Sequence, residues 1–173
     1  MDRYITIVWL LPIIFMVHDF EEIIFFKPWI NKNKNYLAEK FPKISKRFLD
    51  RLCSLSTSGF AFAVAEEFIL LSLITVASVI LDKYVLWLAL FMGFFIHLLL
   101  HIGQWIILKR YIPAIWTTFF ALIYCVYTLH VIISNEIFRF SEIVLWAIIG
   151  LIIVWGNLIF AHKLAGWFDK QKL

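Results

Sequence analysis

Four ionisable side chains interrupt an otherwise apolar segment near the start of the chain: His18, Asp19, Glu21 and Glu22. In a helix, His18, Glu21 and Glu22 are at positions i, i+3 and i+4 and share one face. A charged group at the centre of a bilayer costs about 2.5 kcal/mol or more, so such residues usually turn inward and have partners. Imidazole and carboxylate groups together are typical ligands of Zn, Fe and Mn ions. This stretch therefore predicts a buried polar site whose chemistry suits a divalent metal ion.

Other apolar segments also carry polar residues, namely Glu66, Glu67, His97, His101, Gln104, Asn157 and His162. His97 and His101 are four residues apart and share a helix face, which is a specific metal-binding signal in an apolar helix. We predict that three histidines and four glutamates supply the metal ligands: His18, Glu21, Glu22, Glu66, Glu67, His97 and His101. Gln104, Asn157 and His162 are expected to orient those ligands rather than to bind the ion.

The charge of this set suggests how many ions it holds. Four glutamates would neutralise two divalent cations, so the expected cofactor is one or two ions of Zn, Fe or Mn. Glu22 and Glu67 are the candidate catalytic residues, with a spare carboxylate acting as general base for a water that the metal activates. Glu66 and Glu67 point about 100° apart on a helix, so one of them could bind the ion while the other holds a histidine. Asp19 lies off the His18 face and is expected to meet a Lys or Arg.

The surrounding composition predicts a membrane protein. Of the 173 residues, 63% are hydrophobic, against about 45–50% in soluble domains, and the mean hydropathy is +0.89. Five segments approach the ~20 residues that cross a bilayer, at 4–26, 59–81, 84–108, 112–134 and 142–163. We predict an all-α, five-span, multi-pass protein of the cell (inner) membrane, with residues 1–173 forming one domain.

The basic residues predict its orientation. Eight lie in the 27–58 segment, two follow the third span and three lie in the C-terminal tail, whereas only Arg3, Lys83 and Arg139 lie on the other side. The excess of Lys and Arg places the C-terminus in the cytoplasm and the N-terminus outside. The candidate ligands then share the half of the membrane nearest the cytoplasm. In the 27–58 segment, Ile44, Phe48, Leu52 and Leu55 recur at helical spacing between basic residues, which predicts an amphipathic helix on the inner leaflet.

The stretch His18-Asp19-Phe20-Glu21-Glu22 resembles the motif of the HXXEE-domain family, small multi-span bacterial membrane proteins. Ala65-Glu66-Glu67 and the run from His97 to His101 are similar to the other polar blocks of that family. Because the family has no assigned reaction, the resemblance implies a shared site and no particular chemistry. The Glu66-Glu67 pair is also similar to that of the prenyl-processing glutamate proteases, but the four residues after it, 68–71, include no Arg, which argues against membership.

Three functions fit these residues. The first is a metal-dependent enzyme, of hydrolase or oxygenase type, that acts on a lipid or amphipathic substrate at the cytoplasmic leaflet. The second is a proton- or metal-ion-coupled transporter that uses the same histidines and glutamates. The third is a structural protein in which the polar groups join helices, for instance through a buried ion pair of His18 with a glutamate. Membrane lipid is the expected partner, and no nucleic-acid-binding signature appears.

Overall fold

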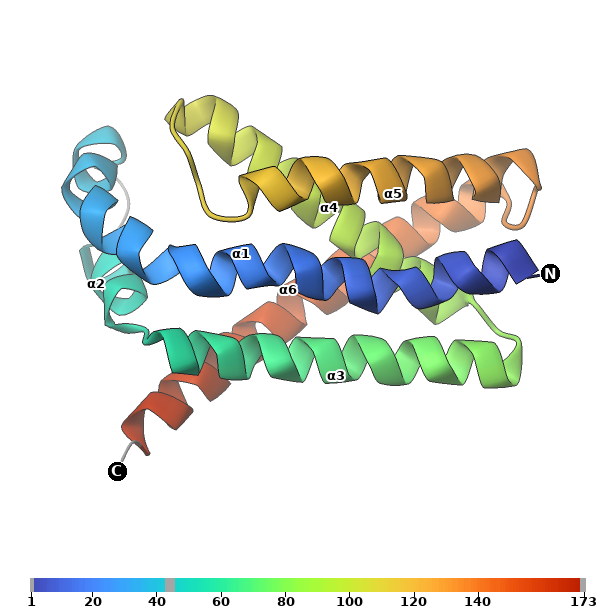
Figure 1. Ribbon diagram of the computed structural model, residues 1–173, viewed down its shortest axis with the longest axis horizontal. Helices are drawn as coiled ribbons and strands as arrows, with labels where there is room; N and C mark the ends of the chain where they lie inside the picture. Colours follow the sequence, from blue (N-terminus) through green and yellow to red (C-terminus); the bar gives the residue numbers. More distant parts are fainter. Residues whose placement is uncertain (1, 43–45, 172–173) are drawn as a thin grey trace.

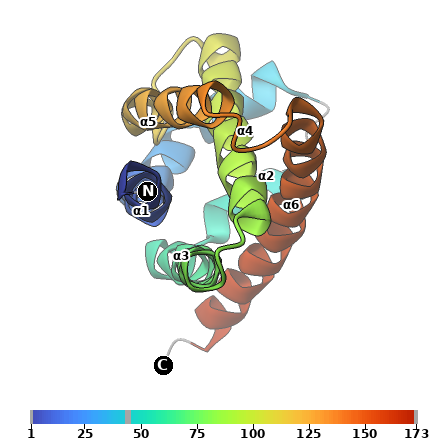
Figure 2. The same cartoon turned by 90° about the vertical axis from the view of Figure 1, so that its right-hand side faces the viewer.

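The computed structural model describes residues 2–42 and 46–171, and within them it contains six helices and no strand. The helices are α1 (Asp2–Lys40), α2 (Lys46–Ser54), α3 (Thr57–Leu81), α4 (Val85–Leu108), α5 (Ile115–Ser134) and α6 (Phe140–Lys170). The prediction of an all-α protein is confirmed. α1 lies between α3 and α5, and α6 lies on the opposite side of α4 (Figures 1 and 2).

Four helices, α3 to α6, are long and apolar enough to cross a membrane, which is compatible with a multi-pass membrane protein. The predicted second and third spans, 59–81 and 84–108, closely match α3 and α4. The predicted fourth span begins before α5, and the predicted fifth span, 142–163, is shorter than α6 at both ends. α1 is not among these four candidate spans, so the count of five is not confirmed, and the orientation stays a prediction.

The helix that contains the first predicted span does not end with that span at residue 26, since α1 continues to Lys40. Ile30 and Leu37 in the added part are seven residues apart, share a helix face, and are buried. They pack in a hydrophobic cluster with Leu108 and Ile115. The helix therefore continues past the apolar segment because its last turns are amphipathic and have a partner surface.

The amphipathic helix predicted after Pro42 exists as α2, although Ile44 lies outside the described residues. Its Leu49 is 4% exposed and packs in the same cluster as Ile30 of α1. Lys34 of α1 pairs with Asp50 of α2, with 2.7 Å between Nζ and Oδ1. Leu49 on the apolar face of α2 is therefore buried against α1, and the position of α2 on the inner leaflet stays a prediction.

α4 forms the centre of the bundle. Trp87, Leu88, Phe91 and Leu98 are fully buried, and Figure 2 shows α4 with helices on several sides. The approach of α6 depends on Gly150, where a Cβ atom would overlap the carbonyl oxygen of Ala89. Small residues allow such close helix contacts in membrane proteins.

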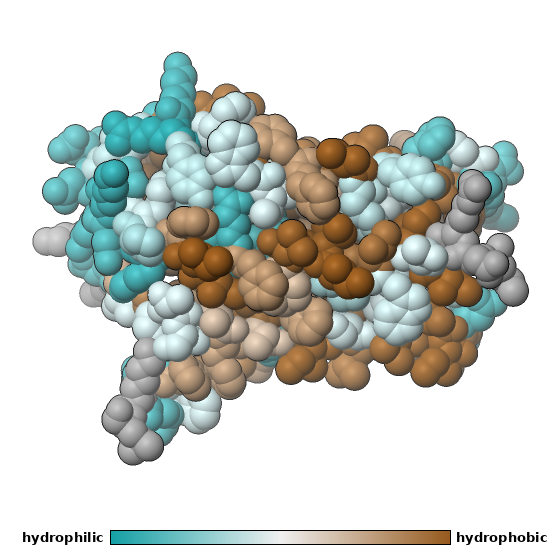
Figure 3. All heavy atoms as spheres, viewed as in Figure 1, coloured by the Kyte–Doolittle hydropathy of each residue, from teal (hydrophilic) through white to brown (hydrophobic). Residues whose placement is uncertain are grey.

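The surface divides along the bundle axis. Hydrophilic residues gather at the end that carries α2 and the turn between α4 and α5, whereas hydrophobic residues predominate in the middle of the visible face (Figure 3). The N-terminus and the turns after α3 and α5 lie at the opposite end (Figure 1). The helices therefore alternate in direction as predicted, with the most basic segments together at one end.

Candidate metal centre

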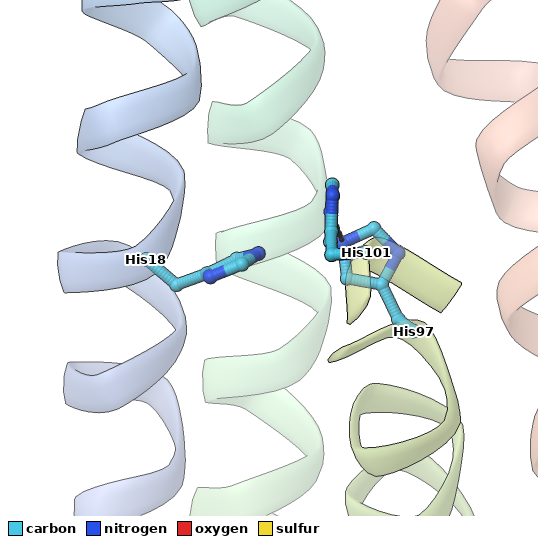
Figure 4. A group of neighbouring side chains, drawn as sticks. All are labelled: His18, His97 and His101. Carbon is cyan, nitrogen blue, oxygen red and sulfur yellow. Dashed lines mark hydrogen bonds between the residues drawn. The ribbon is translucent and has the colours of Figure 1, made fainter. Parts of the chain in front are cut away.

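Three imidazole rings meet between α1 and α4. His18 projects from α1 toward His97 and His101, which lie one turn apart on α4 (Figure 4). The centroid of the His18 ring is 5.5 Å from that of His97 and 5.2 Å from that of His101. Nε2 of His101 lies 2.9 Å from Nε2 of His97, so one ring donates a hydrogen bond to the other. His97 and His101 thus lie next to His18 of the α1 motif, as the sequence predicts.

The geometry of these rings fits a metal ion. One nitrogen from each of His18, His97 and His101 lies within 4.8 Å of the other two. Nitrogens bound to one tetrahedral Zn²⁺ at about 2.0–2.1 Å are about 3.3 Å apart, so only small shifts would bring them to that distance. Nε2 of His18 is buried and has no hydrogen-bond partner among the described residues. An unpaired buried nitrogen is costly, and a cation would satisfy it.

Glu22 adds a carboxylate to the three rings. Its Oε1 lies 3.3 Å from Nε2 of His101, and its side chain is 18% exposed. His18 and Glu22 are four residues apart on α1, so both reach the same side of that helix. A carboxylate beside three imidazoles provides the donor types that Zn, Fe and Mn accept.

A cavity of about 110 Å³ lies beside this cluster, between α1, α3, α4 and α6. Asp19, Glu22 and Glu67 contribute carboxylates to its lining, and His97 contributes an imidazole. Most other lining residues are apolar, and no Lys or Arg of the described chain lines it. The cavity therefore combines an apolar wall with a concentration of acidic groups that has no basic counterpart in its lining.

Glu21, predicted as a ligand, faces α5 instead. Its Oε1 accepts a hydrogen bond of 2.8 Å from the hydroxyl of Tyr111, and its Oε2 accepts one of 2.9 Å from the backbone N–H of Thr117. Because Thr117 is in the first turn of α5, Glu21 caps that helix and complements its dipole. Burial first, and then the hydrogen bond to Glu21, raises the pKa of Tyr111, which keeps the phenol protonated as a donor.

Thr117 connects Glu21 to His18. Its Oγ1 lies 2.8 Å from Oε2 of Glu21 and 3.4 Å from Nδ1 of His18. Because the carboxylate can only accept, the hydroxyl proton points to Glu21, and the hydroxyl oxygen is left to accept from Nδ1–H of His18. This arrangement favours the tautomer whose Nε2 lone pair faces His97 and His101.

The two glutamates of α3 point to different places. Glu67 lines the cavity, whereas Oε2 of Glu66 accepts a hydrogen bond of 3.2 Å from Nδ2 of Asn157 on α6. His162 lies at the cavity lining, is otherwise exposed, and bonds through Nδ1 to the Leu158 carbonyl at 2.8 Å. Gln104 is exposed, one turn after His101. The structure thus brings Glu67 toward the centre and leaves Glu66 as a link between α3 and α6.

Asp19 is the acidic residue that the predicted site omits. It is 4% exposed, it lines the cavity, and its Oδ2 has no hydrogen-bond partner among the described residues. The prediction that Asp19 would meet a Lys or Arg is wrong, since no described basic residue pairs with it. The sequence could have indicated that Asp19 belongs to the site, because Asp19 and Glu22 are at positions i and i+3 and therefore lie on one side of α1.

The described part of the chain defines a helical protein with four long apolar helices and a buried cluster of histidines and carboxylates. The chain belongs to the HXXEE family: the model described as "Protein of unknown function with HXXEE motif" matches residues 9–128. The resemblance in the sequence is thereby confirmed. The matched range includes the three histidines and the cavity carboxylates, and it ends before α6. No curated protein and no solved structure matches the chain.

Proposed function

We propose that this protein is a metal-dependent enzyme embedded in the cell (inner) membrane, and that it acts on a lipid or amphipathic substrate at the cytoplasmic leaflet. The observation that carries the proposal is the convergence of His18, His97 and His101, with Glu22 at 3.3 Å from His101. These four side chains are the proposed ligands. Glu21 is not included because its two oxygens are used by Tyr111 and Thr117.

A Zn-like ion in this position would lower the pKa of a bound water to about 7 and polarise a substrate carbonyl or phosphoryl oxygen. The chain itself supplies the proton acceptor. Glu67 lines the cavity next to the histidines and does not take part in the Glu66–Asn157 link. It is the proposed general base, in the sense of a carboxylate held within reach of the reacting water.

The shape and polarity of the cavity support an amphipathic substrate. Its lining is polar in part, from the carboxylates and His97, and apolar in part, from residues such as Phe15, Leu71 and Phe94. Apolar walls accept a hydrocarbon group and limit the access of bulk water, which strengthens electrostatic interactions inside. A substrate with a polar head and an apolar chain matches both parts.

Metal analysis tests the proposal directly. The full chain, purified in detergent, is expected to bind Zn²⁺, Mn²⁺ or Fe²⁺, and both His18→Ala and His101→Ala should abolish binding. His130→Ala is the matched control, because His130 is an exposed residue of α5 that bonds to Ser134. A folded wild-type protein that takes up none of these ions would contradict the proposal.

The catalytic part needs a second assay. Protein loaded with metal and reconstituted into vesicles of phosphatidylethanolamine and phosphatidylglycerol is expected to produce cleaved or oxidised lipid, detected by mass spectrometry. Glu67→Gln should remove the product. Transport is the alternative that uses the same residues, so ion flux through the vesicle membrane is measured in parallel. Flux without lipid conversion would favour a transporter.

A further inference from the structure

We propose that the carboxylates of Asp19, Glu22 and Glu67 bind a second divalent cation next to the histidine cluster, which makes the centre dinuclear. This inference rests on the proposed function, because Glu22 would be shared between the two ions. The first ion would be held mainly by imidazoles and the second by carboxylate oxygens. Glu67 would use one oxygen for the second ion, which leaves its other oxygen free to accept a proton as the proposed general base.

Asp19 supplies the strongest observation. Its side chain is 4% exposed and lines the cavity, and its Oδ2 is buried with no hydrogen-bond partner among the described residues. A carboxylate in such a place is costly unless a cation or hydrogen-bond donors compensate it. Lys and Arg residues do not supply that compensation, since none of the described ones lines the cavity. A metal cation is the compensating group that fits there.

The three carboxylates are also placed to act together. Asp19 and Glu22 are one turn apart on α1, and Glu67 faces them from α3. Asp19 is close enough to Glu22 and Glu67, and Glu22 is close enough to Glu67, for their like charges to interact. Because like charges repel, three acidic groups around one cavity favour a cation between them.

Glu22 can connect the two ions. Its Oε1 lies 3.3 Å from Nε2 of His101, on the histidine side, and the residue also lines the cavity. A carboxylate has two oxygens and can bridge two metal ions, which in two-metal sites lie about 3.5–4 Å apart. In carboxylate bundles, facing helices supply such bridging groups.

The donor atoms predict different preferences at the two positions. Imidazole suits Zn and Fe, whereas oxygen ligands suit Mg and Mn. Mn²⁺ is therefore the best single probe, because it accepts both donor types and is detected by electron paramagnetic resonance. Two Mn²⁺ ions bridged by Glu22 would give a spin-coupled spectrum that a single ion does not give.

The experiment measures Mn²⁺ bound per chain in the full-length, metal-stripped protein by equilibrium dialysis, and records the spectrum. Two ions per wild-type chain with spin coupling are expected. Asp19→Asn should reduce this to one uncoupled ion, and Glu67→Gln should do the same if Asp19→Asn does not fold. Glu66→Gln is the matched control and should retain two ions, because Glu66 does not line the cavity and its Oε2 accepts a hydrogen bond from Asn157.

The outcomes separate this inference from the proposed function. One ion in the wild type, unaffected by Asp19→Asn and lost in His101→Ala, would overturn the dinuclear centre and leave the proposed function intact. Two ions in both wild type and Asp19→Asn would overturn the assignment of the second site to these carboxylates. No ion in the wild type would overturn both.

Discussion

Glu22 of α1 and His101 of α4 approach each other to 3.3 Å, between Oε1 and Nε2. This contact brings the second glutamate of the HXXEE motif to the histidines of a distant helix, whereas the first glutamate, Glu21, turns to α5. Two adjacent carboxylates of one motif thus have separate tasks. Glu22 belongs to the proposed metal centre, and Glu21 holds the neighbouring helix in place.

The separate roles of Glu21 and Glu22 predict different effects when each is changed to glutamine. Glu22→Gln is expected to weaken metal binding by more than about 100-fold, because changes in the groups around a metal's ligands typically cost about 10–100-fold and Glu22 is a proposed ligand. Glu21→Gln should weaken binding less and should mainly lower the unfolding temperature in detergent, through loss of the α5 cap. Competition titration with a metal-binding dye compares the two variants. Equal loss of affinity in both would contradict the division.

The hydroxyl of Thr117 is expected to orient His18. Thr117→Val removes the group that links Glu21 to Nδ1 of His18, so metal affinity should fall about 10–100-fold although every ligand remains. Thr117→Ser should restore most of it. Thr118→Val is the matched control, because the Thr118 hydroxyl is buried with no partner among the described residues. Wild-type metal affinity in Thr117→Val would contradict the assignment of Thr117 as the residue that orients His18.

The Tyr111–Glu21 hydrogen bond should give a distinct alkaline dependence. The pKa of Tyr111 is raised in the folded protein, first by burial and then by Glu21. Above the ordinary tyrosine pKa of about 10, the unfolded chain releases this proton while the folded chain keeps it, so the free energy of unfolding falls as pH rises. Unfolding followed from pH 8 to 11 should show a smaller fall for Tyr111→Phe. Parallel profiles for the two proteins would contradict this assignment.

The contact of α4 with α6 should depend on one glycine. Gly150→Ala places a methyl group against the carbonyl of Ala89, and overpacking of this kind costs about 1–3 kcal/mol. Gly156→Ala, on the same helix, adds the same methyl group where nothing lies within 4 Å. Thermal unfolding in detergent should therefore show a lower transition for Gly150→Ala only. Similar transitions would mean that α4 and α6 do not pack this closely.

The packing of α2 on α1 makes a further prediction. Leu49→Ala is expected to cost about 2 kcal/mol or more, because Leu49 is 4% exposed in the cluster with Ile30 and Leu37. Asp50→Asn is the comparison, since it removes the exposed ion pair with Lys34 and leaves Leu49 in place. The rate of limited proteolysis in the 46–54 region measures the local unfolding of α2 in both variants. An equal response would indicate that the apolar face of α2 has no partner on α1.

Much of the site could be read from local patterns. Hydrophobic length predicts where α3 and α4 begin and end, because about 20 apolar residues are needed to cross a bilayer. The spacing of His97 and His101 puts them on one face of any helix. Because consecutive spans reverse direction, the predicted spans 4–26 and 84–108 run the same way, and their similar lengths bring the motif of α1 to the level of those histidines before any contact is known.

Tertiary structure decided which polar residues meet. Neighbouring residues differ by about 100° around a helix, so the rotation of α1 against α4 and α5 determines that Glu22 faces His101 while Glu21 faces Thr117. The same rotation turns Asp19 into the cavity. Helix rotation is set by side-chain packing between segments far apart in the chain, and periodicity within one segment carries no information about it.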